Sequence, residues 1–320
     1  MNNAPSSTWF SVSPDWEWFI VLYFFLGGLA GGCYFLAAVI DLFGRREDRP
    51  LARLGYYVAF PCVVVSGMLL TADLGRPLRF WHMLIESNTY RPMFKYWSPM
   101  SIGGWALLIF GGFSFLSFLG ALAEEDSREP AAGSSRRWWP GLRSAATRWP
   151  VLRRLRAPSG LGRAISAIGA IAGLYIAGYT GVLLAVTNRP IWSDTPLLGM
   201  LFVVSGASTS AAVIILLAHR SGWTMPGLAD LRRMDEWVVL LELLVLIAVM
   251  ISLGSVMQAW LNAWGLLLVV GVIIPGLIAP LVLSWRARRV RKMPDATGAI
   301  LVLIGSFLLR VIVVFSSGGL

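Results

Sequence analysis

The sequence predicts an all-α integral membrane protein with eight transmembrane helices, and three observations support this fold class. Hydrophobic residues make up 57% of the 320 residues and charged residues only 14%, whereas an average soluble domain has about 25% charged residues. The mean hydropathy is +0.69. The apolar residues also gather into runs of about 20 or more, the length that crosses the ~30 Å hydrocarbon core of a bilayer.

Eight such runs follow one another, and we treat residues 1–320 as a single membrane domain. The predicted spans cover residues 16–43, 53–75, 98–122, 164–187, 197–219, 237–258, 264–285 and 296–316. The segment before the first span has no basic region and no clear cleavage site, so we expect the first run to stay as a helix. Prolines inside spans, which kink helices, are Pro61 in the second span and Pro275 and Pro280 in the seventh.

The first span contains the sequence GGLAGG at residues 27–32. Gly27 with Gly31, and Gly28 with Gly32, form two overlapping pairs of small residues four positions apart. This pattern lets the backbone of another helix approach closely in lipid. We therefore expect neighbouring helices to pack tightly against the first one.

Positive charge gathers on one side of the predicted topology. The loops after the first, third, fifth and seventh spans hold most of the 27 Lys and Arg residues. The loops on the other side hold Arg76, Arg79, Arg91, Lys95 and Arg189. Because basic loops stay in the cytoplasm, we predict that both termini face the outer, periplasmic side of a multi-pass protein in the cell inner (plasma) membrane.

The longest loop, the basic cytoplasmic loop at residues 124–163, mixes arginine with tryptophan. Such a segment, in a protein with a net charge of +10, is also typical of nucleic-acid binding. Here the basic residues lie in loops between apolar runs. We therefore expect this loop to contact the anionic headgroups of the lipid membrane, and we predict no nucleic-acid partner.

The histidines and cysteines indicate that the protein has no redox centre of its own. Haem b needs axial ligands, commonly histidines, but His82 and His219 fall on opposite faces of the predicted topology. Cys33 and Cys62 lie inside spans, and an iron–sulfur cluster needs four cysteines. We predict no haem and no metal in this chain, so electrons must come from a partner or a diffusible carrier.

Ionisable residues gather toward the predicted outer side. The second span ends in TADLGRPLRFWHM, which places Asp73, Arg76, Arg79 and His82 close together in the sequence. An ionisable group at membrane depth is a functional-site hypothesis by default. The end of the second span is therefore the first part of a predicted site.

Three other spans add polar residues at the same level. Tyr179 lies in the outer half of the fourth span, Arg310 lies about two-thirds of the way out along the eighth, and Glu17 begins the first. An alternative to a functional role is that Arg310 pairs with Asp73 and joins two helices. The two roles are compatible, because a paired arginine can still line a cavity.

This combination of groups suits quinone chemistry. A phenol donates a hydrogen bond to a quinone carbonyl, a cation stabilises reduced anionic forms, and an acid or histidine moves protons. The predicted catalytic residues are Tyr179, Asp73, His82 and Arg310. We expect the quinone headgroup to lie in the outer leaflet among the first, second, fourth and eighth spans.

These residues resemble the NrfD/PsrC family, the membrane subunits of polysulfide-reductase-like molybdenum oxidoreductases. The matching stretches are GLAGG at 28–32, DLGRPLRFW at 73–81, WSPMSIGGW at 97–105, YTGVLLAV with NRPIW from residue 179, and LRVIVV at 309–314. Each stretch is weak alone. Their order along the whole chain makes the resemblance specific.

The resemblance implies eight helices in two four-helix bundles and a quinone pocket near the outer face, contacted by the tyrosine that matches Tyr179. It also implies an iron–sulfur subunit with four [4Fe–4S] clusters and a molybdopterin catalytic subunit as partners. The protein would be the quinone-reactive subunit of this oxidoreductase complex in electron transport, with menaquinone or ubiquinone as ligand. Some relatives carry a quinone-contacting asparagine where Ile20 stands here, so Glu17 or Tyr23 is expected to supply that contact. The other expected quinone-binding residues are Arg76 and Arg79.

Three other functions stay open. One is a subunit of a larger respiratory or photosynthetic complex that oxidises quinol and translocates protons, with Asp41 and Glu242 at the start of an inner half-channel. A second is a secondary transporter, which predicts inverted repeats and helices interrupted at the midplane. No internal repeat is visible, and the polar residues gather at the outer edge. The third is a purely structural anchor.

Overall fold

The computed structural model describes residues 16–124, 140–221, 225–289 and 296–319. This part of the protein is helical between its loops and contains one isolated bridge, between Ile85 and Pro92, but no strand. Eight of its helical segments are long and apolar enough to cross a membrane. The all-α fold class and the eight predicted spans are therefore confirmed.

Seven spans are each built on one long α-helix, and the remaining span is made of three consecutive segments. The single helices are α1 (Trp18–Phe43), α2 (Arg49–Ala72), α3 (Pro99–Ala123), α5 (Gly160–Ala185), α6 (Leu198–Arg220), α7 (Pro226–Leu253) and α10 (Thr297–Phe315). The seventh span consists of α8 (Ala263–Leu267), a π-helical segment (Leu268–Ile278) and α9 (Ala279–Arg289). A short helix, α4 (Pro140–Ala146), lies in the basic loop, of which residues 125–139 are outside the described residues.

Two differences from the predicted spans have local causes. The α7 helix starts at Pro226, well before the predicted start at residue 237, because its first turns carry charged residues that hydropathy does not mark. Arginine, leucine and methionine are good helix formers, so the helix continues beyond the apolar stretch. The π-helical segment contains Pro275, which lacks the N–H that regular α-helical hydrogen bonding needs.

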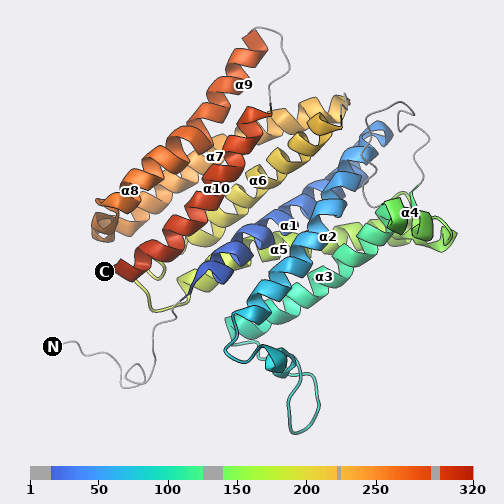
Figure 1. Ribbon diagram of the computed structural model, residues 1–320, viewed down its shortest axis with the longest axis horizontal. Coiled ribbons are helices and arrows are strands. Elements are labelled where there is room, and N and C mark those ends of the chain that lie inside the picture. Colours follow the sequence, from blue (N-terminus) through green and yellow to red (C-terminus); the bar gives the residue numbers. More distant parts are fainter. Residues whose placement is uncertain (1–15, 125–139, 222–224, 290–295, 320) are drawn as a thin grey trace.

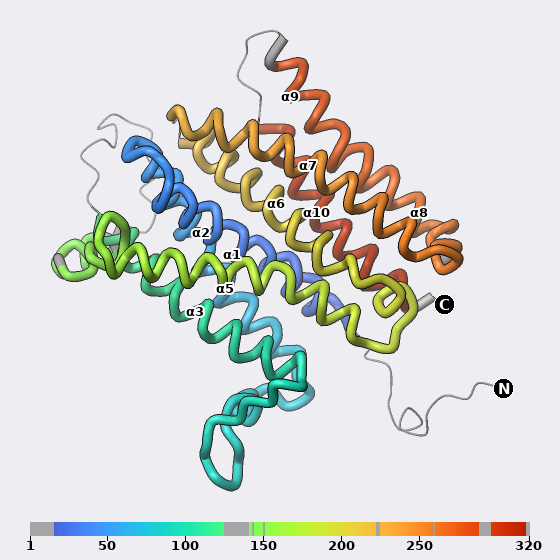
Figure 2. The backbone as a smooth tube through the Cα atoms, turned by 180° about the vertical axis from the view of Figure 1, so that it is seen from behind, coloured from blue at the N-terminus to red at the C-terminus, as the bar shows by residue number. Residues whose placement is uncertain are grey.

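The first span is the most enclosed of the eight. In both views of the backbone, α1 lies between α2 and α6 (Figures 1 and 2). In an apolar 18-residue stretch of this span, 72% of the residues are buried, compared with 28% in the corresponding stretch of the seventh span. The helix that carries the GGLAGG sequence is therefore the centre around which the other helices pack.

The glycines of α1 permit this central position. A Cβ atom at Gly31 would collide with the carbonyl oxygen of Gly173 in α5. A Cβ atom at Gly32 would lie 2.7 Å from the carbonyl oxygen of Gly206 in α6. The backbones of three helices therefore approach each other directly, as the small-residue pattern predicted.

The packed helices share two buried apolar cores. One core joins the N-terminal part of α1 to the outer part of α5, to α6 and α7, to the seventh span and to α10. The other joins the rest of α1 to α2, α3, α5 and the second half of α6. The α1, α5 and α6 helices contribute to both cores, and so does α7, whose Leu228 and Leu231 belong to the second core. The grouping into two four-helix bundles and the outward orientation of both termini stay predictions.

We predict that Gly31→Leu destabilises the fold, because its side chain has no space between α1 and α5. Overpacking of a well-packed interior costs about 1–3 kcal/mol, and a collision with backbone places this substitution at the upper end of that range. The measurement is the thermal unfolding midpoint of the detergent-solubilised protein. Gly67→Leu is the matched control, because no atom lies within 4 Å of a Cβ at Gly67. Equal midpoints for the two variants would contradict the packing argument.

Candidate functional site

Tyr179 and Tyr23 lie together where α1, α3 and α5 meet. Tyr179 is 6% exposed, and its hydroxyl donates a hydrogen bond to the carbonyl oxygen of Pro99, 2.8 Å away. Its ring lies against Gly103, where a Cβ atom would collide with it. The ring of Tyr175 stacks on Tyr179 with 5.8 Å between the ring centroids. A Cβ atom added at Gly27 would lie 3.8 Å from the ring of Tyr23 and 3.9 Å from the side chain of Thr180, which follows Tyr179, so three phenols gather at this place.

Arg310 lies elsewhere, enclosed by α1, α6 and α10. It is 1% exposed, and its Nη1 donates hydrogen bonds to the hydroxyl of Ser205 at 2.7 Å and to the hydroxyl of Ser306 at 2.6 Å. A Cβ atom at Gly28 would lie 3.4 Å from its Nη2. Its acidic neighbour is Glu242 of α7, with which it interacts electrostatically. Arg310 is therefore part of a buried polar cluster inside the helix packing.

Asp73, which follows the last residue of α2, lies near Glu17, which precedes the first residue of α1, at the predicted outer ends of these two helices. Asp73 is exposed. Partial burial, and then the charge of Glu17, raise the pKa of Asp73 above its usual value. Both carboxyl groups were predicted as parts of the outer site, and the structure places them near enough for the charge of Glu17 to act on Asp73. The pairing of Asp73 with Arg310, considered as an alternative, does not occur, because Arg310 is enclosed by other helices.

The remaining predicted residues lie on the surface beyond α2, in and beside a 3₁₀ segment (Pro77–Met83). Arg76 and Arg79 are exposed. The ring of His82 stacks on Trp81, and its Nδ1 forms a hydrogen bond with the hydroxyl of Ser87. Within the described residues, no group of three or more His, Cys, Asp and Glu side chains is arranged to hold a metal ion.

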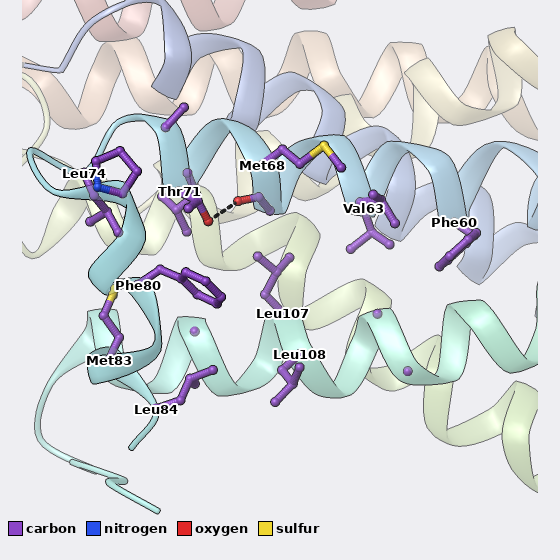
Figure 3. Close-up of a pocket in the computed structure, with 18 residues that line it drawn as sticks. Phe60, Val63, Met68, Thr71, Leu74, Phe80, Met83, Leu84, Leu107 and Leu108 are labelled. Carbon is purple, nitrogen blue, oxygen red and sulfur yellow. Dashed lines mark hydrogen bonds between the residues drawn. The ribbon is translucent and has the colours of Figure 1, made fainter. Parts of the chain in front are cut away.

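A cavity of about 720 Å³ lies between the predicted outer halves of α2 and α3, next to the 3₁₀ segment (Figure 3). Apolar side chains dominate its lining, and those labelled in the figure are Phe60, Val63, Met68, Leu74, Phe80, Met83, Leu84, Leu107 and Leu108. The labelled polar side chain is Thr71, whose hydroxyl donates to the carbonyl oxygen of Gly67 at 2.8 Å. The cavity therefore has the surface chemistry of a site for an apolar ligand.

None of the predicted site residues lines this cavity, although several border it. Leu74 and Met83 line it, and each is the sequence neighbour of a predicted residue, Asp73 and His82. Tyr179 packs against Gly103, and the next residue, Gly104, lines the cavity. Tyr179 and the cavity thus lie against adjacent faces of α3. The cavity has little signal in the sequence, because the outer half of α3 is mostly apolar and carries no ionisable residue.

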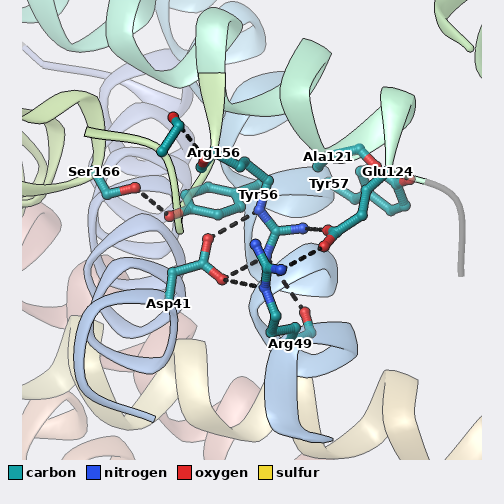
Figure 4. A network of polar contacts seen from close by, with 9 residues as sticks. Asp41, Arg49, Tyr56, Tyr57, Ala121, Glu124, Arg156 and Ser166 are labelled. Carbon is teal, nitrogen blue, oxygen red and sulfur yellow. Dashed lines mark hydrogen bonds and ion pairs between the residues drawn. The ribbon is translucent and has the colours of Figure 1, made fainter. Parts of the chain in front are cut away.

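A second polar network, which the sequence did not predict, lies at the other end of α1 and α2 (Figure 4). Arg156, which follows the 3₁₀ segment Pro150–Leu155 in the basic loop, is 2% exposed. Its Nε donates to one oxygen of Asp41 at 2.9 Å, and its Nη2 donates to the other at 2.5 Å. Its Nη1 pairs with Glu124, which also pairs with Arg49 at 3.3 Å.

This network neutralises Asp41 and therefore does not support its predicted role at the start of an inner half-channel. Burial alone would lower the pKa of Arg156, but the nearby charges of Asp41 and Glu124 raise it. The guanidinium group also lies over the ring of Tyr56, 5.4 Å from the ring centroid. Asp41 and Arg156 are 115 positions apart, so no local pattern in the sequence indicates their contact. Part of the loop assigned to lipid headgroups is therefore bound to the helices.

Comparison with known proteins identifies relatives along almost the whole sequence. A family model described as polysulphide reductase, NrfD, matches residues 11–318. A polysulfide reductase chain of Wolinella succinogenes is 27% identical over 285 residues, covering 84% of this chain and 82% of that protein. Protein NrfD of Escherichia coli is 25% identical over 317 residues, covering 94% of both proteins. A selenate reductase subunit of Mesobacillus selenatarsenatis is 28% identical over 93 residues, covering 29% of this chain and 20% of that protein.

We predict that Arg156→Met destabilises the fold by about 3–5 kcal/mol, because removing one partner of a buried ion pair leaves the other charge unpaired. The measurement is the free energy of unfolding in detergent. Adding Asp41→Asn to Arg156→Met should recover part of the loss, because the unpaired charge is then absent. Arg154→Met is the matched control on the same segment, since Arg154 is exposed. Equal effects of Arg156→Met and Arg154→Met would contradict the pairing.

Proposed function

We propose, from the premise that this chain belongs to the polysulphide reductase NrfD family, that it is the quinone-interacting anchor of a membrane-bound oxidoreductase complex. Homologues of this protein are named as membrane subunits or chains of reductases. In this proposal, the protein exchanges electrons between an iron–sulfur partner at the outer face and the membrane quinone pool. A molybdopterin subunit behind that partner would carry the catalytic reaction.

The observation that carries the proposal is the apolar cavity between α2 and α3. Its volume of about 720 Å³ falls within the ~300–1,000 Å³ typical of small-molecule sites. An isoprenoid tail is purely apolar, and so is most of the cavity lining. The cavity lies in the outer half of the predicted membrane span. Because the protein has no predicted redox centre to carry electrons deeper, an electron acceptor must lie near this face.

Polar groups around the cavity suit the other end of a quinone. When bound, the quinone would take up or release two electrons and two protons. Tyr179 has the donor that a quinone carbonyl needs, and its hydroxyl would exchange its present acceptor, the carbonyl of Pro99, for the ligand. Asp73 and His82 are neighbours of lining residues at the surface, so they can exchange protons with the outer aqueous phase.

The outer loop at residues 76–97 is proposed as the docking surface of the iron–sulfur partner. It carries four basic residues, Arg76, Arg79, Arg91 and Lys95, which suit an acidic partner surface. Large aromatic side chains are exposed beside them, among them Phe94, Tyr96 and Trp97. Buried aromatic anchors carry much of the binding energy in protein interfaces, so these side chains are suited to a contact that covers them.

The cavity can be tested by filling it. No atom lies within 4 Å of a Cβ at Gly111, which lines the cavity, so Gly111→Trp should place its indole inside without disturbing the fold. We expect the KM for quinone of the assembled complex to rise at least tenfold, which corresponds to ~1.4 kcal/mol of binding. Activity with artificial dyes should be unchanged. Ile171→Trp, on the exposed face of α5, is the control, and equal KM values for the two variants would place the ligand elsewhere.

The tyrosine cluster can be tested separately. Tyr179→Phe removes one donor, and the loss of a hydrogen bond to a charge-developing group costs ~2–4 kcal/mol of transition-state stabilisation. Quinone-linked turnover should therefore fall by about two to three orders of magnitude on this scale, while dye-linked activity stays. Tyr175→Phe is the matched control, because its ring stacks on Tyr179 at the same site. Parental turnover in the Tyr179 variant would exclude this tyrosine as the donor.

The docking surface can be tested by charge reversal. Arg79→Glu should weaken co-purification of the iron–sulfur subunit, more strongly at low salt because exposed charges are screened by ions. Arg233→Glu, an exposed residue near the start of α7, is the control on the predicted cytoplasmic side. If only the Arg233 variant loses the partner, the iron–sulfur subunit docks on the side that carries Arg233. That result would contradict both the proposed docking surface and the predicted topology.

A further inference from the structure

Three ionisable side chains on α7 and α10, outside the proposed quinone cavity, have buried polar atoms. Glu242 of α7 is 2% exposed, and Arg310 of α10 is 1% exposed. Asp235, two turns before Glu242, has a buried Oδ1 with no hydrogen-bond partner among the described residues. Ionisable groups inside a membrane protein are costly and mark ion or proton pathways. An unpartnered carboxylate oxygen is especially costly to bury, so these groups need an explanation.

The three groups form a column along α7 and α10. Asp235 and Glu242 are seven residues apart, which places them on one face of α7 and about 10 Å apart along its axis. Glu242 lies close to Ser205 and Ser208 of α6 and interacts electrostatically with Arg310. The column therefore passes from α7 to the contact between α6 and α10.

Hydroxyl groups continue the column at that contact. The hydroxyl of Ser306 lies 3.0 Å from that of Ser205 and 2.5 Å from that of Thr209. Arg310 donates to both Ser205 and Ser306. Hydroxyl and carboxyl groups both donate and accept hydrogen bonds, which is the property that proton transfer along a series of groups requires.

The column crosses much of the predicted membrane span. Asp235 lies in the first part of α7, which starts from the predicted cytoplasmic side, and Arg310 lies in the last third of α10. Beyond Arg310 lies Gly28 of α1. A Cβ atom added at the neighbouring Gly27 would lie 3.8 Å from the ring of Tyr23. Within the described residues, the glycine segment of α1 therefore lies between the end of the column and the Tyr23 and Tyr179 phenols.

The chemistry of the column favours a proton over a metal cation. Arg310 keeps its positive charge under all ordinary conditions, and a fixed cation repels sodium or another metal ion, as cationic groups do in selective pores. A proton passes between oxygens without an ion having to fit beside the guanidinium group. The ~10 Å step between Asp235 and Glu242 is longer than one hydrogen bond, so water must bridge it.

We infer that Asp235, Glu242 and the hydroxyl cluster at Arg310 form a proton path from the cytoplasmic side toward the quinone site. This inference rests on the proposed function, because the path needs a reaction that consumes or releases protons. Reduction of the quinone takes two electrons from the iron–sulfur partner and two protons, and oxidation returns both. With this path, the protons are exchanged with the cytoplasm instead of with the outer phase through Asp73 and His82, so electron transfer from the outer face builds a membrane potential.

The test uses the complete complex in sealed liposomes, with a voltage-sensitive dye and a parallel assay of quinone-linked turnover. The parental complex should build a potential during turnover. Glu242→Gln and Asp235→Asn should each lower the potential per turnover at least tenfold, and Glu242→Asp, which keeps a carboxyl group, should restore it. Asp230→Asn, an exposed carboxylate on the same helix, is the control and should behave as the parent. Dye-linked activity and co-purification of the partners report whether each variant is assembled.

Each outcome separates the two proposals. Turnover without a potential in the parental complex, or an unchanged potential in both the Glu242→Gln and Asp235→Asn variants, would overturn the proton path and leave the quinone function in place. A potential that depends on sodium and is kept in the presence of a protonophore would assign the column to a metal cation and overturn the proton path. Absence of quinone-linked turnover in a parental complex that is active with dyes would instead overturn the proposed function.

Discussion

Direct backbone contact between α1 and its neighbours is the constraint on which the rest of the structure depends. Gly31 lies against Gly173 of α5, and Gly32 lies against Gly206 of α6. In lipid there is no hydrophobic driving force between helices, so association depends on close packing and on polar contacts. A side chain at these positions would separate the helices. The tyrosine cluster and the Arg310 cluster would then lose the geometry that α1 imposes on both.

The two polar networks bury charge in different ways. At the predicted cytoplasmic end, Asp41 and Arg156 pair through two hydrogen bonds, and Glu124 and Arg49 complete the balance of two acids and two bases. A paired set of this kind holds a loop and three helices in one arrangement. In the core that includes α7 and α10, Asp235, Glu242 and Arg310 lack that balance, and Asp235 Oδ1 and Arg310 Nε have no hydrogen-bond partner among the described residues. Complete pairing suits a structural role, whereas incompletely paired carboxyl groups such as Asp235 are suited to gain and lose protons.

The proposed quinone site combines features that come from different helices. The cavity belongs to α2, α3 and the 3₁₀ segment beyond α2, and its lining is apolar. The phenol that would bind a quinone carbonyl comes from α5 and reaches α3 through Pro99 and Gly103. Arg310 lies on the far side of α1 from the tyrosines, so in the proposed site it would act on a ligand through its electric field and not by contact. This division would separate the binding of the apolar tail from the electrostatics of the headgroup.

The sequence by itself determined the eight spans and the packing role of the first helix. Both follow from local properties, because the hydropathy of about 20 residues decides insertion and glycines four positions apart share one helix face. It also marked Tyr179, Asp73 and Arg310 as unusual by their depth. Only the tertiary structure decided their partners. Asp41 binds Arg156 across 115 positions, Arg310 lies beside Glu242 and not Asp73, and the cavity lies beside α3, whose sequence carries no ionisable residue. Contacts between helices depend on their rotation and order in space, and these are set by the packing of all helices together.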